Sequence, residues 1–202
     1  IRNRIINTAA ELFSRDGIRP VTMTQVAEAA GVSKRTLYAC FQSKDDLLRE
    51  CIVNHFEQQK IIHRQLAEES DNPVDLIHRL FRHGVMMLRK SRPGFSLELK
   101  TLYPVLHNDL LAPMQAEGVK NVAAMLKDGV EKGYFHNDFD PEIASQALHA
   151  KIRMVTDENT FPASSYALAD VFRQILVIFL RGCATPRGLK EIETLFSEDN
   201  LK

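Results

Sequence analysis

The sequence predicts an all-α fold, and three observations support this prediction. Apolar residues recur three and four positions apart along nearly the whole chain of 202 residues, which is the spacing of an amphipathic helix. No convincing stretch alternates apolar and polar residues between hairpin turn signals, as a β-strand would. Asn72, Asp140 and Thr185 each stand directly before a proline, a pattern typical of a capped helix start. We therefore expect helices joined by short loops.

The composition limits the classes of protein to consider. The chain has 26 basic and 26 acidic residues, so it lacks the positive charge of a protein that coats nucleic acid without specificity. Its three cysteines are odd in number and far apart, which argues against a disulfide framework. No apolar stretch reaches the roughly 20 residues of a membrane span, and the first residues lack a cleavable signal pattern. We expect a cytoplasmic protein with no membrane partner.

The first predicted helix carries Ile5, Ala9 and Phe13 on one face, as a helix packed on a core would. Gly17 supplies the left-handed conformation that commonly ends a helix, and Pro20 follows it. A helix is therefore expected to end near residue 17.

A second and a third helix follow, joined by a tight turn. Thr22 and Gln25 have the spacing of a capping box, which starts the second helix. Gly31 breaks that helix, and Ser33 is placed to cap the third one. Two short helices joined by a glycine turn are typical of a helix-turn-helix, whose second helix enters the major groove of DNA.

The predicted third helix has one apolar and one polar face. Helical spacing turns Leu37 and Phe41 inward and Arg35 outward. An outward arginine can form a bidentate pair with guanine, while threonine and alanine can contact a thymine methyl group. The candidate DNA contacts lie on this outer face and in the first turns of the neighbouring helices: Thr22, Thr24, Ser33, Lys34, Arg35, Thr36, Tyr38 and Lys44.

A long helix over residues 43–69 is predicted to link two domains, residues 1–50 and residues 51–202. The second part has further amphipathic patterns, of which residues 168–180 differ because they leave little polar face. We expect a second copy of the chain to cover that helix. The residues expected at this dimer interface are Leu148, Ile152, Phe172, Ile175 and Phe179.

Residues 21–48, VTMTQVAEAAGVSKRTLYACFQSKDDLL, resemble the DNA-binding domain of the tetracycline-repressor (TetR) family. This resemblance implies a homodimeric transcriptional regulator of double-stranded DNA, usually a repressor that a small-molecule inducer releases from its operator. It also implies DNA contacts at Thr24, Lys34, Arg35, Thr36, Tyr38 and Lys44. Arg35 departs from the family pattern, because many members have a small residue there. This difference affects which operator sequence the protein is expected to read, and not whether it binds DNA.

The family resemblance also implies a ligand pocket within residues 51–202, for an inducer whose identity the sequence does not give. Apolar side chains with a few polar groups among them are typical of such pockets. The candidate lining residues are Phe81, His83, Met87, Phe95, Leu99, Tyr103, His107, Met125 and His149. Ordinary core packing is the simpler explanation for the apolar members of this set, because any helical core needs apolar residues at this spacing.

Two other classes of protein remain as alternatives. An enzyme is disfavoured because the chain contains no GxGxxG, P-loop, HExxH or GxSxG motif. The histidines do not form a metal-ligand pattern, and we expect neither a metal nor a cofactor. A helical adaptor that binds other proteins through residues 51–202 is harder to exclude, since an apolar helix serves either purpose.

Overall fold

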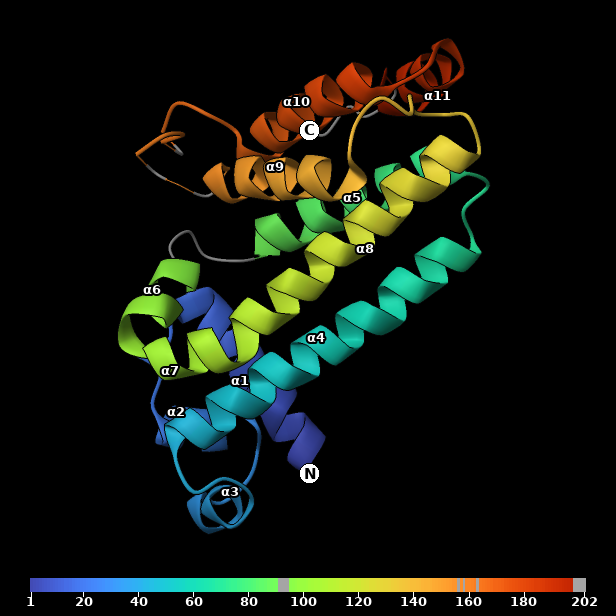
Figure 1. The fold of residues 1–202 in the computed structure, drawn as a ribbon. Helices are drawn as coiled ribbons and strands as arrows, with labels where there is room; N and C mark the ends of the chain where they lie inside the picture. The colour runs from blue at the N-terminus through green and yellow to red at the C-terminus, as the bar shows by residue number, and fades with distance from the viewer. Residues whose placement is uncertain (91–94, 156, 158, 163, 198–202) are drawn as a thin grey trace. The chain divides into compact units, whose positions relative to one another are not determined.

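The predicted all-α fold is confirmed by a computed structural model (Figure 1). The structure describes residues 1–202 except 91–94, 156, 158, 163 and 198–202; the side chains of residues 90 and 95–97 also lie outside the described part. The elements in chain order are α1 (Arg2–Asp16), α2 (Met23–Ala29), α3 (Lys34–Cys40), α4 (Lys44–Glu68), α5 (Pro73–Lys90), α6 (Phe95–Leu102), α7 (Pro104–Leu106), the π-helical segment η1 (His107–Leu111), α8 (Ala112–Glu131), α9 (Pro141–Met154), α10 (Leu168–Cys183) and α11 (Pro186–Ser197).

The predicted helix starts are confirmed by their cap hydrogen bonds. Thr22 forms the predicted capping box at α2, and the side chain of Ser33 accepts an amide hydrogen bond at α3. Asn72, Asp140 and Thr185 accept amide hydrogen bonds in the first turns of α5, α9 and α11. These caps satisfy amides that have no partner inside a helix, which is why the residue type alone located the starts.

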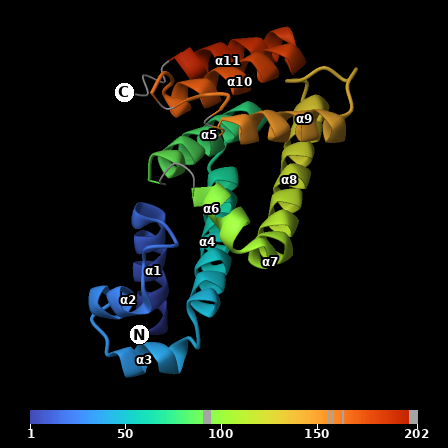
Figure 2. The same cartoon turned by 90° about the vertical axis from the view of Figure 1, so that its left-hand side faces the viewer.

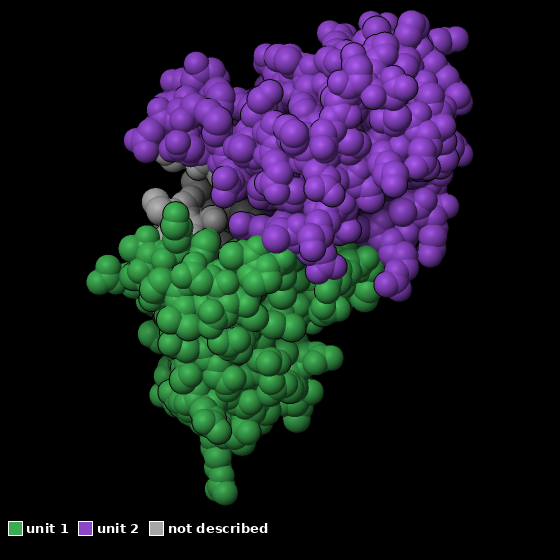
Figure 3. Space-filling view, viewed as in Figure 1, with its two compact units in different colours: residues 1–62, 89–114 green, residues 63–88, 115–202 purple. Residues whose placement is uncertain are grey.

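The chain folds as two compact units, coloured separately in Figure 3. Unit 1 consists of residues 1–62 and 89–114, and unit 2 of residues 63–88 and 115–202. Residues 89–114, which lie well beyond residue 50, therefore pack with the N-terminal helices: Leu99 and Leu106 are 1% and 6% exposed in their core. The division of function at residue 50 stays a prediction.

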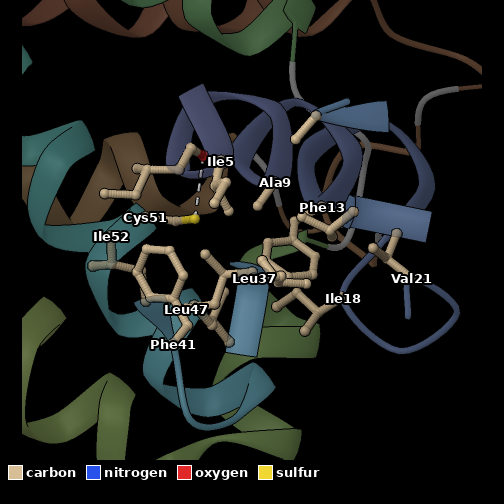
Figure 4. Close-up of a cluster of buried hydrophobic side chains, with 14 of the residues drawn as sticks. Ile5, Ala9, Phe13, Ile18, Val21, Leu37, Phe41, Leu47, Cys51 and Ile52 are labelled. Carbon is tan, nitrogen blue, oxygen red and sulfur yellow. Dashed lines mark hydrogen bonds between the residues drawn. The ribbon is translucent and has the colours of Figure 1, made fainter. Parts of the chain in front are cut away.

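The core of unit 1 joins α1, α3 and α4 (Figure 4). Phe13, Leu37, Phe41 and Leu47 are almost completely buried there. Side chains of this size each contribute about 1.5–3 kcal/mol by leaving water. Leu37 and Phe41 thus fix the inner face of α3, as the sequence predicted.

Unit 2 has its own core, in which Phe81 of α5, Leu126 of α8, Leu180 of α10 and Phe196 of α11 are buried. Within the described residues, no helix combines the length and the apolar character that crossing a membrane requires.

Candidate DNA-binding site and ligand pocket

The turn between α2 and α3 depends on one glycine. Gly31 has a φ of +61°, a conformation that other residues adopt only with strain. The chain reverses there, and the amide of Val32 donates to the carbonyl oxygen of Ala27 over 3.0 Å. Figure 2 shows α3 joined to α2 by this short turn, near the start of α1. The geometry is that of a helix-turn-helix.

The outer face of α3 is open, as the sequence predicted. Lys34 and Arg35 are exposed, and the side chain of Tyr38 is 52% exposed. These groups can reach base edges or phosphates, while the inner face is fixed in the core of unit 1. Their contact with DNA itself remains a prediction.

The hydroxyl groups among the candidate DNA contacts are partly occupied within the chain. Ser33 Oγ accepts from the Thr36 amide at 3.0 Å and lies 2.8 Å from Thr36 Oγ1. Thr22 Oγ1 accepts from the amide of Gln25 at 3.3 Å, and Thr24 is half-buried. The methyl group of Thr36 is therefore the more suitable part of that side chain for reading a thymine.

Lys44, one of the candidate DNA contacts, has a structural partner. Its Nζ donates to the carbonyl oxygen of Arg19 at 3.2 Å and lies 5.9 Å from the ring centre of Phe13. Burial lowers the pKa of Lys44, although the nearby carboxylates of Glu98 and Asp45 oppose that effect. Lys44 therefore braces the turn before α2, in addition to any role on DNA.

Two residues that the sequence did not single out hold the helix-turn-helix in place. Glu98 of α6 accepts hydrogen bonds from the backbone amides of Ile18 and Arg19. Arg2 of α1 donates to the carbonyl oxygen of Cys40, the last residue of α3. Neither Arg2 nor Glu98 has a local sequence signal, because the backbone groups that each side chain binds lie tens of residues away in the sequence.

A small apolar pocket of about 120 Å³ lies in unit 2, between α5, α8, α9 and α10. All its lining residues are apolar: Ile77, Leu80, Phe81, Val122, Met125, Leu126, Leu148, Ile152, Phe172, Leu176 and Leu180. The rings of Phe81 and Phe172 meet edge to face at one wall, 5.0 Å apart. Such a lining favours an uncharged hydrocarbon group.

The structure brings only some of the predicted pocket residues together. Phe81 and Met125 line the apolar pocket. His149 is half-buried on α9, where burial, and then the charge of Arg153, lower its pKa. The ring of His83 instead meets the ring of His63 at 5.9 Å.

The other predicted pocket residues lie elsewhere. Leu99, Tyr103 and His107 belong to unit 1, where burial, and then the carboxylates of Asp45 and Glu98, raise the pKa of Tyr103. Met87 is half-buried on α5, and the side chain of Phe95 lies outside the described residues. The sequence could not separate these residues, since apolar helical spacing is the same in a core and in a pocket.

A larger hollow of about 650 Å³ lies between α8 and α9 in unit 2. Lys120 and Lys127 on α8 line it together with Asp140 and Glu142 at the start of α9. Its mixed charges make it less selective for an apolar molecule than the smaller pocket.

The residues expected at a dimer interface divide into two groups. Leu148, Ile152 and Phe172 line the apolar pocket of their own unit, whereas Ile175 and Phe179 are half-buried on α10. The large apolar residues that are exposed on α9 and α10 are others: Ile143, Met154 and Ile178, which are 70%, 45% and 69% exposed. A helix that is apolar on most sides does not reveal from its sequence which side faces the core.

In the part of the chain that the structure describes, no three histidine, cysteine, aspartate or glutamate side chains are grouped so that they could hold a metal ion.

Comparison with known proteins agrees with the geometry of unit 1. Residues 5–51 match the family model described as "Bacterial regulatory proteins, tetR family". The HTH-type transcriptional repressor KstR2 of Rhodococcus jostii is 25% identical over 190 residues, which are 93% of each chain.

Solved structures share the fold over most of the chain. FadR from Bacillus subtilis, a transcriptional regulator solved in complex with stearoyl-CoA, has a TM-score of 0.72 and 18% identity, over 90% of this chain and 99% of that one. A protein from Saccharomonospora viridis in complex with choline has a TM-score of 0.78 and 20% identity, over 91% and 97%.

The matched region contains the capped α2, the glycine turn and the exposed face of α3, so sequence and geometry identify the same DNA-binding element. Such proteins are transcriptional regulators and not enzymes. Residues 5–51 are a DNA-binding domain of the tetR family of bacterial regulatory proteins, and the chain is a DNA-binding transcriptional regulator with an N-terminal helix-turn-helix.

Proposed function

We propose that the chain is a homodimeric repressor which a small, largely apolar molecule releases from its DNA operator. The observation that carries the ligand part of this proposal is the exclusively apolar lining of the pocket in unit 2. The similarity to transcriptional repressors such as KstR2 supports repression. Residues 1–50 would contact DNA, and residues 51–202 would bind the ligand and the second copy.

The outer face of α3 is proposed to read the operator. Arg35 would pair with a guanine, and Lys34 and Tyr38 would contact a base edge or phosphates. Because a dimer presents this helix twice, the two copies must lie about 34–36 Å apart, one turn of DNA, or somewhat more. The operator is then expected to be close to palindromic.

The second copy is proposed to bind along α9 and α10. Ile143, Ala147, Ala150 and Met154 are all exposed and recur three or four positions apart on α9, so they form one apolar stripe. Ile178 adds an exposed side chain on α10, which packs against α9. Exposed apolar stripes of this kind mark interaction surfaces, and a two-fold axis lets one surface serve both copies.

The ligand is proposed to insert an uncharged group about the size of one ring. A cavity of about 150 Å³ lined by leucine, isoleucine and phenylalanine binds benzene, and the pocket here has about 120 Å³. A cation such as choline lacks a carboxylate partner among the lining residues. A longer hydrocarbon would have to separate α5 from α10, which approach closely where Gly84 faces the ring of Phe172.

Ligand binding would act on DNA through the continuous helices. Both α4 and α8 run from one unit into the other, and Val122, Met125 and Leu126 of α8 line the pocket. A ligand that displaces α8 would favour a state in which the two copies of α3 no longer fit successive grooves. The ligand can shift this equilibrium only by its preference for that state.

A release assay tests the proposal. A duplex selected from a random pool is labelled, bound to the full chain and titrated with benzene, stearoyl-CoA or choline. We expect benzene, or the acyl chain of stearoyl-CoA, to weaken DNA binding, and we expect choline to have no effect. Val122→Phe, which fills the pocket, should abolish that release, whereas Lys127→Met in the larger hollow should not. Release by choline alone, or release unchanged in Val122→Phe, would contradict the proposal.

A further inference from the structure

One arginine of α1 joins that helix to α4 and to the end of α3, the helix proposed to read DNA. The guanidinium of Arg2 donates from Nη1 to the carbonyl oxygen of Cys40 at 2.8 Å and pairs through Nη2 with Glu50 Oε2 at 2.8 Å. Its central carbon lies 4.4 Å from the ring centre of Phe41. Arg2 belongs to α1, Cys40 ends α3 and Glu50 lies in α4.

The position of Cys40 explains why this contact matters. The last carbonyl groups of a helix have no helical partner, and a positive charge is favourable at that end. A planar guanidinium can donate to a carbonyl and a carboxylate while it stacks on an aromatic ring, which an ammonium group cannot do as well. Phe41 is fully buried, so the guanidinium is set against a fixed surface.

The helix α3 is so short that its position depends on the contacts at both of its ends. α3 has only seven residues, about two turns, and its start is held by the Ser33 cap. Base readout requires side chains held within about 0.5 Å and 10–20° of the productive geometry. Phosphate contacts are less demanding, since they carry no sequence information.

We propose that Arg2 is a positioning residue for DNA reading: by holding the Cys40 end of α3 against α1 and α4, it sets the sequence preference without contacting a base. This inference rests on α3 being the helix that reads DNA. The side chain of Arg2 is 46% exposed, so direct contact with a phosphate is the competing role, and the two roles predict different dependence on salt.

The test compares affinity for a duplex selected from a random pool with affinity for its scrambled version, using the full chain. Arg2→Met should lower the ratio of the two affinities about tenfold, because base contacts weaken. Affinity for the scrambled duplex should stay within about twofold, and the slope of log affinity against log salt should not change. Arg15→Met is the matched control, since Arg15 pairs with its neighbour Asp16 on the exposed end of α1.

Two more variants keep the test decisive if Arg2→Met folds poorly. Arg2→Lys keeps the charge but loses the planar group, and should give an intermediate ratio with a normal thermal midpoint. Glu50→Gln removes the ion pair while leaving the bond to Cys40, and should lower the ratio less than Arg2→Met does.

Two results would overturn the role of Arg2. One is an unchanged affinity ratio in both Arg2 variants. The other is equal loss of affinity for both duplexes with a salt slope shallower by about two for a dimer, which indicates direct phosphate contact. A wild-type chain with no sequence preference, or a preference unaffected by Arg35→Ala, would instead refute the proposed reading by α3 itself.

Discussion

The carboxylate of Glu98 accepts a hydrogen bond of 2.7 Å from the backbone amide of Arg19, although 79 residues separate the two in the sequence. Its second oxygen accepts from the amide of Ile18 at 3.1 Å. One side chain of α6 therefore holds the turn that precedes α2, and Lys44 holds the same turn from the carbonyl side. The turn before the helix-turn-helix thus depends on a residue outside the first fifty.

Replacement of Glu98 by glutamine should destabilise unit 1. A glutamine has one acceptor oxygen, so one of the two amides loses its partner. Ile18 is a buried residue, and an unsatisfied buried donor costs about 1–3 kcal/mol. The free energy of unfolding, measured with urea, should fall by about that amount. Exchange of the Ile18 and Arg19 amide hydrogens should become faster. Glu11→Gln on the exposed face of α1 is the control, and equal stability of the two variants would refute the role of Glu98.

Two helical glycines should respond in opposite ways to alanine. At Gly188 of α11, a methyl group would overlap the backbone oxygen of Tyr134, whereas at Gly118 of α8 it would meet nothing within 4 Å. Gly188→Ala should therefore lower the free energy of unfolding by about 1–3 kcal/mol through overpacking. Gly118→Ala should raise it by about 0.5–1 kcal/mol, because alanine favours the helix. Thermal or urea unfolding measures both, and a stabilised Gly188→Ala variant would contradict the close packing of α11.

A charge on the open face of α10 should separate the proposed dimer. Ile178→Glu would place an unpaired carboxylate inside the interface, which is strongly unfavourable. Sedimentation should then show a single chain with normal helix content, while Thr194→Glu on the exposed face of α11 should leave a dimer intact. Ile178 is preferable to Phe179, since Phe179 also packs on the core of unit 2. A dimer that survives Ile178→Glu would remove this face from the interface.

Cys51 should be unreactive while unit 1 is folded. Burial, and secondarily the charge of Glu50, raise the pKa of its thiol to about 12, and its Sγ donates to the carbonyl oxygen of Ile6. The thiolate is the reactive form, so at pH 9 only about one thiol in a thousand would be ionised. Because the pKa in the unfolded chain is lower, alkylation by iodoacetamide should rise sharply when urea unfolds the chain. Mass spectrometry locates the label, and rapid labelling of Cys51 in native buffer would contradict its burial.

The sequence predicted the features that depend on neighbouring residues. The caps at Thr22, Ser33 and Asp140 were predictable because a short polar side chain satisfies amides only a few positions away. The inner face of α3 was predictable because Leu37 and Phe41 have helical spacing. The candidate DNA-binding face follows from the same periodicity.

The features that depend on distant contacts could not be predicted. α6, α7 and η1 pack with unit 1, so Leu99 and Tyr103 belong to that unit, whereas the apolar pocket is lined by residues of unit 2. The partners of Arg2 and Glu98 are likewise far away in the sequence. Leu148 was expected on an interface yet lines the pocket, since an apolar residue has the same spacing in both environments.

Salt dependence of DNA binding tests the central claim, that the exposed face of α3 binds DNA in a symmetric dimer. A labelled duplex selected from a random pool is titrated with the full chain at several salt concentrations. If a dimer neutralises about eight phosphates, log affinity should fall with log salt at a slope of about −7, and Arg35→Ala should cost the selected duplex about 1–3 kcal/mol. A flat salt response, with Arg35→Ala indistinguishable from wild type, would contradict the account.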